Sequence, residues 1–168
     1  MIRMGLDGST KCSGWCIFDD DKLLHHGKII ADKNLEWRER VVYMMNQVAI
    51  LIKKYKVEEL CVELPVKTIA NVNTLEQLFS LHGAILGVAS ALHIKFTPVN
   101  VNTWRKELGL LVDIPKGTKD KRSILKERSV KLANKLYDLD LIWKSKTSKD
   151  NDDDISDAIL IAHTVIHK

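Results

Sequence analysis

The sequence predicts an α/β fold, in which a mixed five-stranded sheet is flanked by helices within a single domain spanning residues 1–168. Two observations support this prediction. Three short strand-like segments separated by turn residues come first, and the hydrophobic period then changes to helices that alternate with two more strands. Strands joined by tight turns pair antiparallel, whereas strands joined through a helix pair in parallel. The order of elements therefore predicts three antiparallel strands followed by two parallel ones.

The first part of the chain contains the predicted antiparallel strands. Three segments are short, apolar or alternating, and bounded by turn residues: 2–6, 13–18 and 23–30. From Asn34 onward, apolar side chains recur at helical spacing: Val41, Met44, Met45, Val48, Ile52 and Tyr55. The segment ELCVE at 59–63 predicts a buried strand that ends before Pro65.

A second helix is predicted to begin at Asn73, with Asn73 and Glu76 capping each other's backbone. Its apolar stripe consists of Leu75, Leu78, Phe79, His82 and Leu86. We expect Phe79 to lie in the core. Gly83 and Gly87 indicate that another element approaches this helix closely.

The rest of the chain predicts one more strand and three helices. HIKFTPV at 93–99 is the fifth strand, and VNTWRKEL at 101–108 is a short helix. A basic amphipathic helix follows at 117–136, and a polar, lysine-rich loop at 138–153 leads to the final helix at 154–167.

Composition excludes several classes of protein. The apolar fraction of 45% and charged fraction of 29% are typical of a soluble globular domain. No apolar run approaches the roughly 18 residues of a membrane span, and the N-terminus does not resemble a signal peptide. Three cysteines form no disulfide framework, and Cys12 and Cys16 lack a second ligand pair for zinc. We expect a cytoplasmic protein with reduced cysteines and no membrane association.

Basic residues are concentrated in one segment. Residues 95–149 hold 14 Lys and Arg against 6 Asp and Glu, a local charge of +8, whereas the whole chain carries +4. The simplest alternative is a solvated face. A contiguous basic segment favours a polyanionic partner.

Four carboxylates fall at the predicted ends of elements. Asp7 ends the first strand, Glu63 ends the fourth, and Asp154 and Asp157 share one face of the last helix. If they converge, their charges repel one another unless cations lie between them, and hard oxygen ligands suit Mg²⁺ or Mn²⁺. Each residue taken singly also fits a turn, an exposed strand end or a helix cap.

The three acidic segments LDGSTKCSGWCIF, CVELP and DISDAILIAH resemble the motifs of RuvC-type Holliday junction resolvases, nucleases with the RNase H-like fold. The resemblance covers nearly the whole chain and is strongest to the bacteriophage branch. It implies that four residues bind two Mg²⁺ or Mn²⁺ ions per site and are catalytic: Asp7, Glu63, Asp154 and Asp157. Asp153 is an alternative to Asp154.

The same resemblance implies a homodimer that nicks opposing strands of a four-way DNA junction, leaving 5′-phosphate and 3′-hydroxyl ends, without a small-molecule cofactor. We expect the helix at 74–92 to form the dimer interface. The stretch with Lys119, Lys121 and Arg122 resembles the phosphate-contacting segment of the family. Arg105 and Lys106 are further candidates for DNA contacts.

One feature of the family is missing. Bacterial members place an aromatic residue shortly after the second acidic motif, where this chain has Val66. We therefore expect weak sequence preference at the crossover, with cleavage of other branched DNA as well. Three alternatives remain: an actin-like or sugar-kinase phosphate-binding protein, for which DGST is also typical, an RNA-processing nuclease of the same fold, and a non-catalytic binding module.

Overall fold

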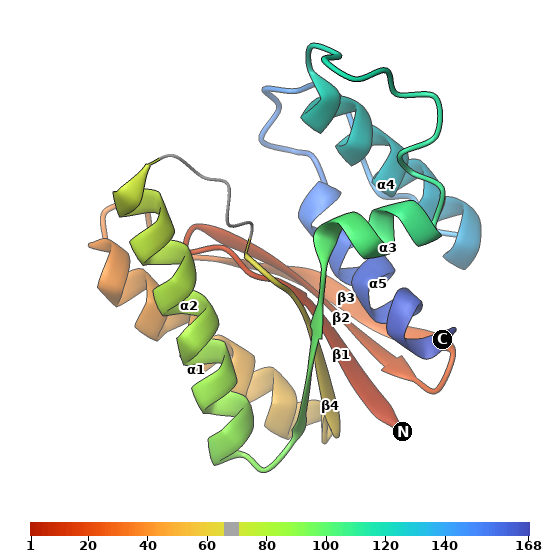
Figure 1. Cartoon of the computed structure of the whole chain (residues 1–168). Helices are drawn as coiled ribbons and strands as arrows, with labels where there is room; N and C mark the ends of the chain where they lie inside the picture. The colour runs from red at the N-terminus through yellow and green to blue at the C-terminus, as the bar shows by residue number, and fades with distance from the viewer. Residues whose placement is uncertain (66–70) are drawn as a thin grey trace.

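The computed structural model describes residues 1–65 and 71–168 and contains a five-stranded mixed sheet in the order β3-β2-β1-β4-β5 (Figure 1). Its strands are β1 (Ile2–Asp7), β2 (Cys12–Asp19), β3 (Lys22–Ile30), β4 (Glu59–Glu63) and β5 (Lys95–Val99). The first three pair antiparallel, and β4 pairs in parallel with both β1 and β5. The predicted sheet is confirmed.

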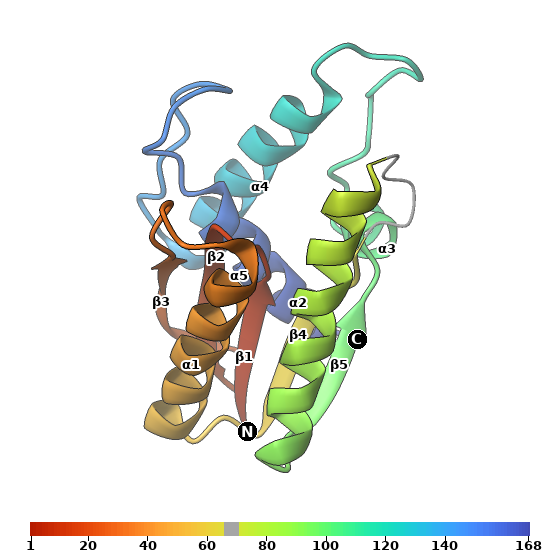
Figure 2. The same ribbon diagram turned by 90° about the vertical axis from the view of Figure 1, so that its left-hand side faces the viewer.

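Helices cover both faces of the sheet (Figures 1 and 2). Along one face run α1 (Trp37–Tyr55) and α2 (Val72–Ala91), and on the other lie α3 (Val101–Glu107), α4 (Lys121–Tyr137) and α5 (Asp153–Ile166). Each face has its own hydrophobic core, one built with α1 and α2 and the other around α5. The sheet thus separates two chemically distinct sides of the molecule.

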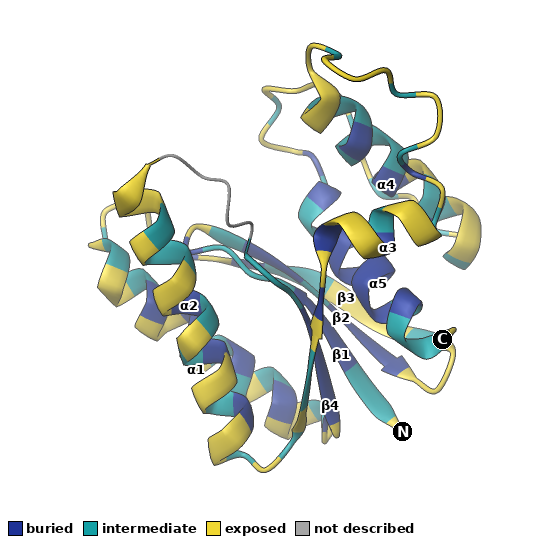
Figure 3. Ribbon diagram, in the orientation of Figure 1, coloured by how far each residue is buried: buried dark blue, intermediate teal, exposed yellow. Residues whose placement is uncertain are grey.

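The helix α5 lies unusually close to the sheet. A Cβ built on Gly5 would overlap the carbonyl oxygen of Ala158, and one built on Gly14 would overlap that of Asp154. Only glycine therefore allows the helix backbone to rest on β1 and β2. Most of α5 is buried as a result (Figure 3).

The start of α2 differs from the prediction. The capping residue is Asn71, whose side chain accepts a hydrogen bond from the backbone N–H of Asn73 at 3.0 Å. Glu76 does not complete a capping box, since it pairs with Arg38 at 3.2 Å instead. Two asparagines two residues apart can each cap a helix, and local sequence does not decide between them.

The buried face of α2 also differs from the prediction. Leu81, Ile85 and Ala89 pack into the core, whereas Phe79 is 47% exposed and Leu86 is 48% exposed. The placement of Phe79 in the core was therefore wrong. Nothing in the described chain lies within 4 Å of a Cβ built on Gly83 or Gly87, so the close approach expected there is wrong within one protomer.

Helix α2 is apolar around much of its circumference, which left its buried face ambiguous in the sequence. Despite its apolar character, α2 is not long and apolar enough to cross a membrane, and neither is any other helix of the described residues.

The packing of α5 gives a direct prediction for stability. Gly14→Ala should destabilise the protein by about 1–3 kcal/mol or more, because the new methyl group must displace helix backbone rather than a flexible side chain. Thermal unfolding should show a midpoint lower by several degrees. Asn46→Ala is the control: Asn46 is exposed within α1, and alanine has the higher helix propensity, so the midpoint should be unchanged or higher. Equal midpoints for Gly14→Ala and wild type would contradict this packing.

Candidate functional site

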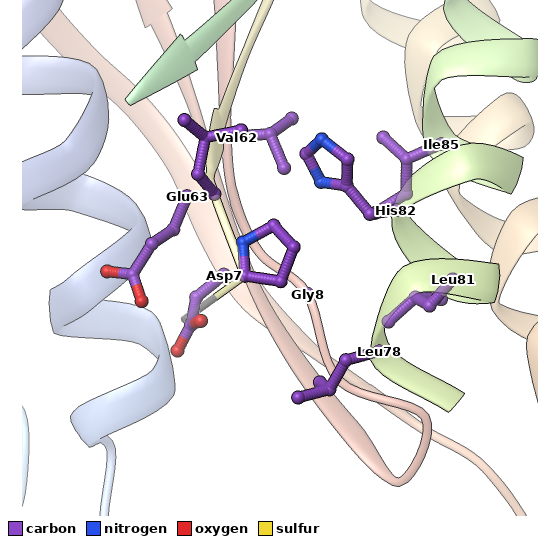
Figure 4. Close-up of a pocket in the computed structure, with 10 residues that line it drawn as sticks. Asp7, Gly8, Val62, Glu63, Leu78, Leu81, His82 and Ile85 are labelled. Atoms are coloured by element: carbon purple, nitrogen blue, oxygen red, sulfur yellow. The ribbon is translucent and has the colours of Figure 1, made fainter. Parts of the chain in front are cut away.

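Two of the predicted carboxylates lie side by side at one edge of the sheet. Strand β1 pairs in parallel with β4, and Leu6 lies opposite Val62, so the next residues, Asp7 and Glu63, end neighbouring strands. In Figure 4 both carboxylates point toward α5, away from the apolar wall that α2 contributes. The sequence prediction that these two strand ends meet is confirmed.

The other two carboxylates come from the first turns of α5. Burial raises the pKa of Asp7 well above its usual range, and the negative charges of Asp157, Glu63 and Asp154 raise it further. Burial also raises the pKa values of Glu63 and Asp154. Asp7 therefore lies within electrostatic reach of the other three predicted residues.

Helix α3 holds two of these carboxylates in place. The indole Nε1 of Trp104, a fully buried side chain, donates a hydrogen bond to Glu63 Oε2 at 2.8 Å. The Arg105 guanidinium lies 5.0 Å from the centre of the Trp104 ring and pairs with Asp157 Oδ2 at 3.4 Å. The sequence predicted a DNA contact for Arg105 but not the contact of Trp104 with Glu63; the adjacent Trp-Arg pair after the fifth strand was the available signal.

Asp157 is the most confined of the four. Burial raises its pKa to about 6, outweighing the nearby Arg105 guanidinium, which lowers it. Its Oδ1 atom is buried and has no hydrogen bond of good geometry among the described residues, although the buried Ser129 hydroxyl lies near enough to lower the pKa of Asp157. A buried carboxylate oxygen without a good hydrogen bond is uncommon and calls for an explanation.

Asp153, the alternative to Asp154, is occupied elsewhere. It is buried and forms an ion pair with Lys126 of α4. By contrast, the negative charge of Asp154 raises the pKa of Asp7. These contacts favour Asp154 as the member of the acidic cluster.

The donors in this cluster fit a hard divalent cation. All four side chains offer oxygen ligands, and burial raises the pKa of each. Repulsion by other members of the cluster further raises the pKa values of Asp7 and Asp157. As the side chains stand, no three Asp, Glu, His or Cys residues of the described chain converge tightly enough to hold one ion. Metal binding would therefore require rotation of Asp7 and Asp154, the two acids that Trp104 and Arg105 do not hold.

The predicted DNA-contacting residues other than Arg105 are exposed. Lys106 lies near the end of α3, and Lys119, Lys121 and Arg122 lie at or just before the start of α4. Within residues 1–65 and 71–168 none of these four forms an ion pair, so their charges are available to a ligand. The Val66 position, where family members place an aromatic residue, lies outside the described residues.

Comparison with solved structures identifies the fold. Over 99% of this chain and 94% of the other, it superimposes on Thermus thermophilus RuvC in complex with a Holliday junction substrate, with a TM-score of 0.74 and 15% identity. The chain has the fold of RuvC.

Two other resolvase structures are also similar. The yeast mitochondrial Holliday junction resolvase Ydc2 matches with a TM-score of 0.64 at 15% identity, over 98% of this chain and 77% of that one. Fowlpox virus resolvase with its Holliday junction DNA matches with 0.56 at 18% identity, over 99% and 97%. No protein-family profile and no curated protein sequence matches the chain. The RNase H-like fold is thus confirmed, and the bacteriophage branch stays a prediction.

The raised pKa of Asp157 predicts that the stability of the metal-free protein depends on pH. In the folded protein its pKa is about 6, whereas the usual value is 3.9, so the folded state holds this proton more tightly than the unfolded state. Without metal, ionisation of Asp157 therefore lowers the free energy of unfolding as the pH rises from about 4 through 6. Asp157→Asn removes that loss of stability. It also lowers the pKa of Asp7, which the charge of Asp157 raises, and this change acts in the same direction. The stability of the variant relative to wild type should therefore increase over this interval, by up to about 3 kcal/mol.

Calorimetry in a chelator at several pH values measures this difference. His163, whose pKa is lowered to about 4 by burial, acts in the opposite direction, but it is present in both proteins and cancels. A difference that does not change with pH would show that Asp157 titrates normally.

Proposed function

We propose that this protein is a metal-dependent, structure-selective endonuclease that resolves four-way DNA junctions by paired nicks in opposing strands. The observation that carries the proposal is the meeting of Asp7, Glu63, Asp154 and Asp157 at one edge of the sheet. The fold around them is shared with solved structures of resolvases in complex with Holliday junction DNA. A fold alone does not imply an activity, so the support for nuclease activity comes from the arrangement of these four acids.

The four carboxylates would hold Mg²⁺ or Mn²⁺, two ions per site. When bound, such ions supply a water of lowered pKa for attack on phosphorus and stabilise the departing 3′ oxygen. Asp7 lies within electrostatic reach of the other three carboxylates, so it would hold metal together with each of them. The products would carry 5′-phosphate and 3′-hydroxyl ends.

Trp104 and Arg105 would act as positioning residues. The Trp104 N–H fixes one oxygen of Glu63, and Arg105 neutralises part of the charge of Asp157 while it stacks on Trp104. Because both come from one short helix, they hold two acids from different elements at a constant separation. Such support restricts the rotation of the ligands without contacting the substrate.

The exposed basic residues would place the junction over this site. Lys106, Lys119, Lys121 and Arg122 offer contacts to phosphates, which orient DNA but carry no base information. We therefore propose that branch geometry governs cleavage, with weak dependence on the bases at the crossover. Three-way junctions and forks would also be cut.

Single substitutions test the catalytic assignment. Asp7→Asn, Glu63→Gln, Asp154→Asn and Asp157→Asn should each reduce nicking of an end-labelled four-way junction in Mg²⁺ by at least about 100-fold, because each removes a charged metal ligand. Junction affinity without metal should persist, since these changes remove negative charge.

Asp150→Asn is the matched control, because Asp150 is exposed and pairs only with Lys144 among the described residues. It should nick at the wild-type rate. Substantial nicking by Asp7→Asn would rule out the proposed site. A linear duplex tests structure selectivity, structured RNA tests the RNA-nuclease alternative, and ATP hydrolysis tests the phosphate-binding alternative.

We further propose that the protein acts as a homodimer joined through α2. Paired nicks in opposing strands require two sites related by a two-fold axis. Along α2, Val72, Phe79 and Leu86 are exposed at seven-residue intervals, so they form one apolar stripe. Gly83 and Gly87 are exposed beside it and offer room for a second helix.

Charge placed on this stripe should break the dimer. Phe79→Asp combined with Leu86→Asp should lower the sedimentation coefficient at micromolar concentration to that of a monomer, because desolvated charges would face each other across the axis. Val112→Asp is the control, because Val112 is 59% exposed and lies outside α2. It should leave the sedimentation coefficient unchanged. A wild-type protein that is monomeric both alone and with junction DNA would contradict the dimer.

A further inference from the structure

A second cavity lies on the Asp154 side of the acidic cluster. It has a volume of about 410 Å³ and lies where the start of α4, the loop before α5 and the end of β3 meet. Five cationic side chains line it: Lys28, Arg122, Lys126, Lys146 and Lys149. Trp143, Ile30 and Asp154 also line it, so the cavity adjoins the proposed site of nicking.

Trp143 is not explained by core packing. Trp104 belongs to a hydrophobic core, and Trp15 and Trp37 pack against one, but Trp143 belongs to neither cluster and is only partly buried. In the same cavity Ile30 is 66% exposed. An aromatic ring and an isoleucine thus form an apolar surface open to solvent within a strongly basic cavity.

The backbone on both sides of Trp143 is held firmly. Ile142 donates its N–H to Asp152 Oδ2 at 2.9 Å and accepts one from the Asp152 N–H at 2.8 Å. Lys144 donates its N–H to Asn151 Oδ1 at 2.9 Å. Asn151 and Asp152 lead directly into α5, so the backbone that carries Trp143 is tied to the start of the helix that carries Asp154.

Two of the cations in the cavity are available to a ligand. Lys28 pairs with Asp152, Lys126 with Asp153 and Lys146 with Asp120. Arg122 and Lys149 have no acidic partner among the described residues. The cavity therefore combines an aromatic surface with two unneutralised cations, which are the two features that bind a base and its phosphate.

We propose that this cavity binds one unpaired nucleotide of branched DNA, with its base stacked on Trp143 and the adjoining phosphates held by Arg122 and Lys149. The proposal rests on the proposed nuclease function and adds a strand-binding subsite beside the site of nicking. Stacking tolerates any base, because every base has an aromatic face. The subsite therefore recognises the unpaired state of the strand rather than its sequence.

Binding without metal tests the subsite, because cleavage is then prevented. The probe is a forked DNA with one single-stranded arm, and a second fork lacks the bases of the three nucleotides next to the branch. Trp143→Ala should bind the intact fork about 5- to 150-fold more weakly than wild type, with an unchanged salt slope. Wild type should bind the abasic fork more weakly than the intact fork by a similar factor. Trp143→Ala should bind the two forks with equal affinity.

Two further variants separate stacking from charge. Arg122→Ala with Lys149→Ala should shrink the slope of log affinity against log salt by about 0.7 for each phosphate of the single-stranded arm that is no longer neutralised. Trp143→Phe should keep most of the affinity but lose the quenching of tryptophan fluorescence that DNA causes in wild type. Trp37→Phe, a change on the opposite face of the sheet, should retain that quenching.

The outcomes distinguish this inference from the function on which it rests. A folded Trp143→Ala protein with wild-type affinity for the intact fork, or full quenching in Trp143→Phe, would overturn the subsite and leave the nuclease function standing. A wild-type protein that prefers neither fork nor junction over linear duplex would overturn both. If Trp143→Ala does not fold, the quenching comparison between Trp143→Phe and Trp37→Phe decides.

Discussion

The contact between the backbone of α5 and the strands β1 and β2 determines the geometry of the acidic cluster. Gly5 and Gly14 remove the two Cβ atoms that would hold the helix away from the sheet. As a result, carboxylates at the start of α5 reach the end of β1, where Asp7 lies. A helix lifted by the thickness of one methyl group would still pack on the sheet but would carry Asp154 and Asp157 away from Asp7.

Bringing four acids together has an electrostatic cost that the surrounding residues only partly offset. Arg105 and Lys126 lower the pKa of Asp157, but burial still raises it to about 6. Complete neutralisation by the protein's own cations would leave no attraction for a metal ion. The remaining repulsion, together with the Asp157 Oδ1 atom that has no hydrogen bond of good geometry among the described residues, is thus consistent with a site that is stabilised when divalent cations bind.

The sequence predicted the parts of this arrangement that follow from local rules. Strand ends are visible as apolar runs that stop at Asp7 and Glu63, and parallel neighbours necessarily end at the same edge. By contrast, the partners of these acids come from distant segments, so nothing local indicated that Arg105 faces Asp157. The burial of α2 was also ambiguous, because its apolar residues extend beyond one face and the core contacts Leu81 and Ile85 rather than Phe79.

The sheet places the two proposed interaction surfaces on opposite sides of the molecule. The apolar stripe of α2 lies on the face that α1 and α2 cover, whereas the basic start of α4 and the cavity containing Trp143 belong to the face that α5 covers. Between them, the acidic cluster at the sheet edge adjoins both α2 and that basic cavity. Pairing of two chains through α2 would therefore leave the basic face of each uncovered. Two copies of the acidic edge could then reach opposing strands of one junction without competition between assembly and DNA binding.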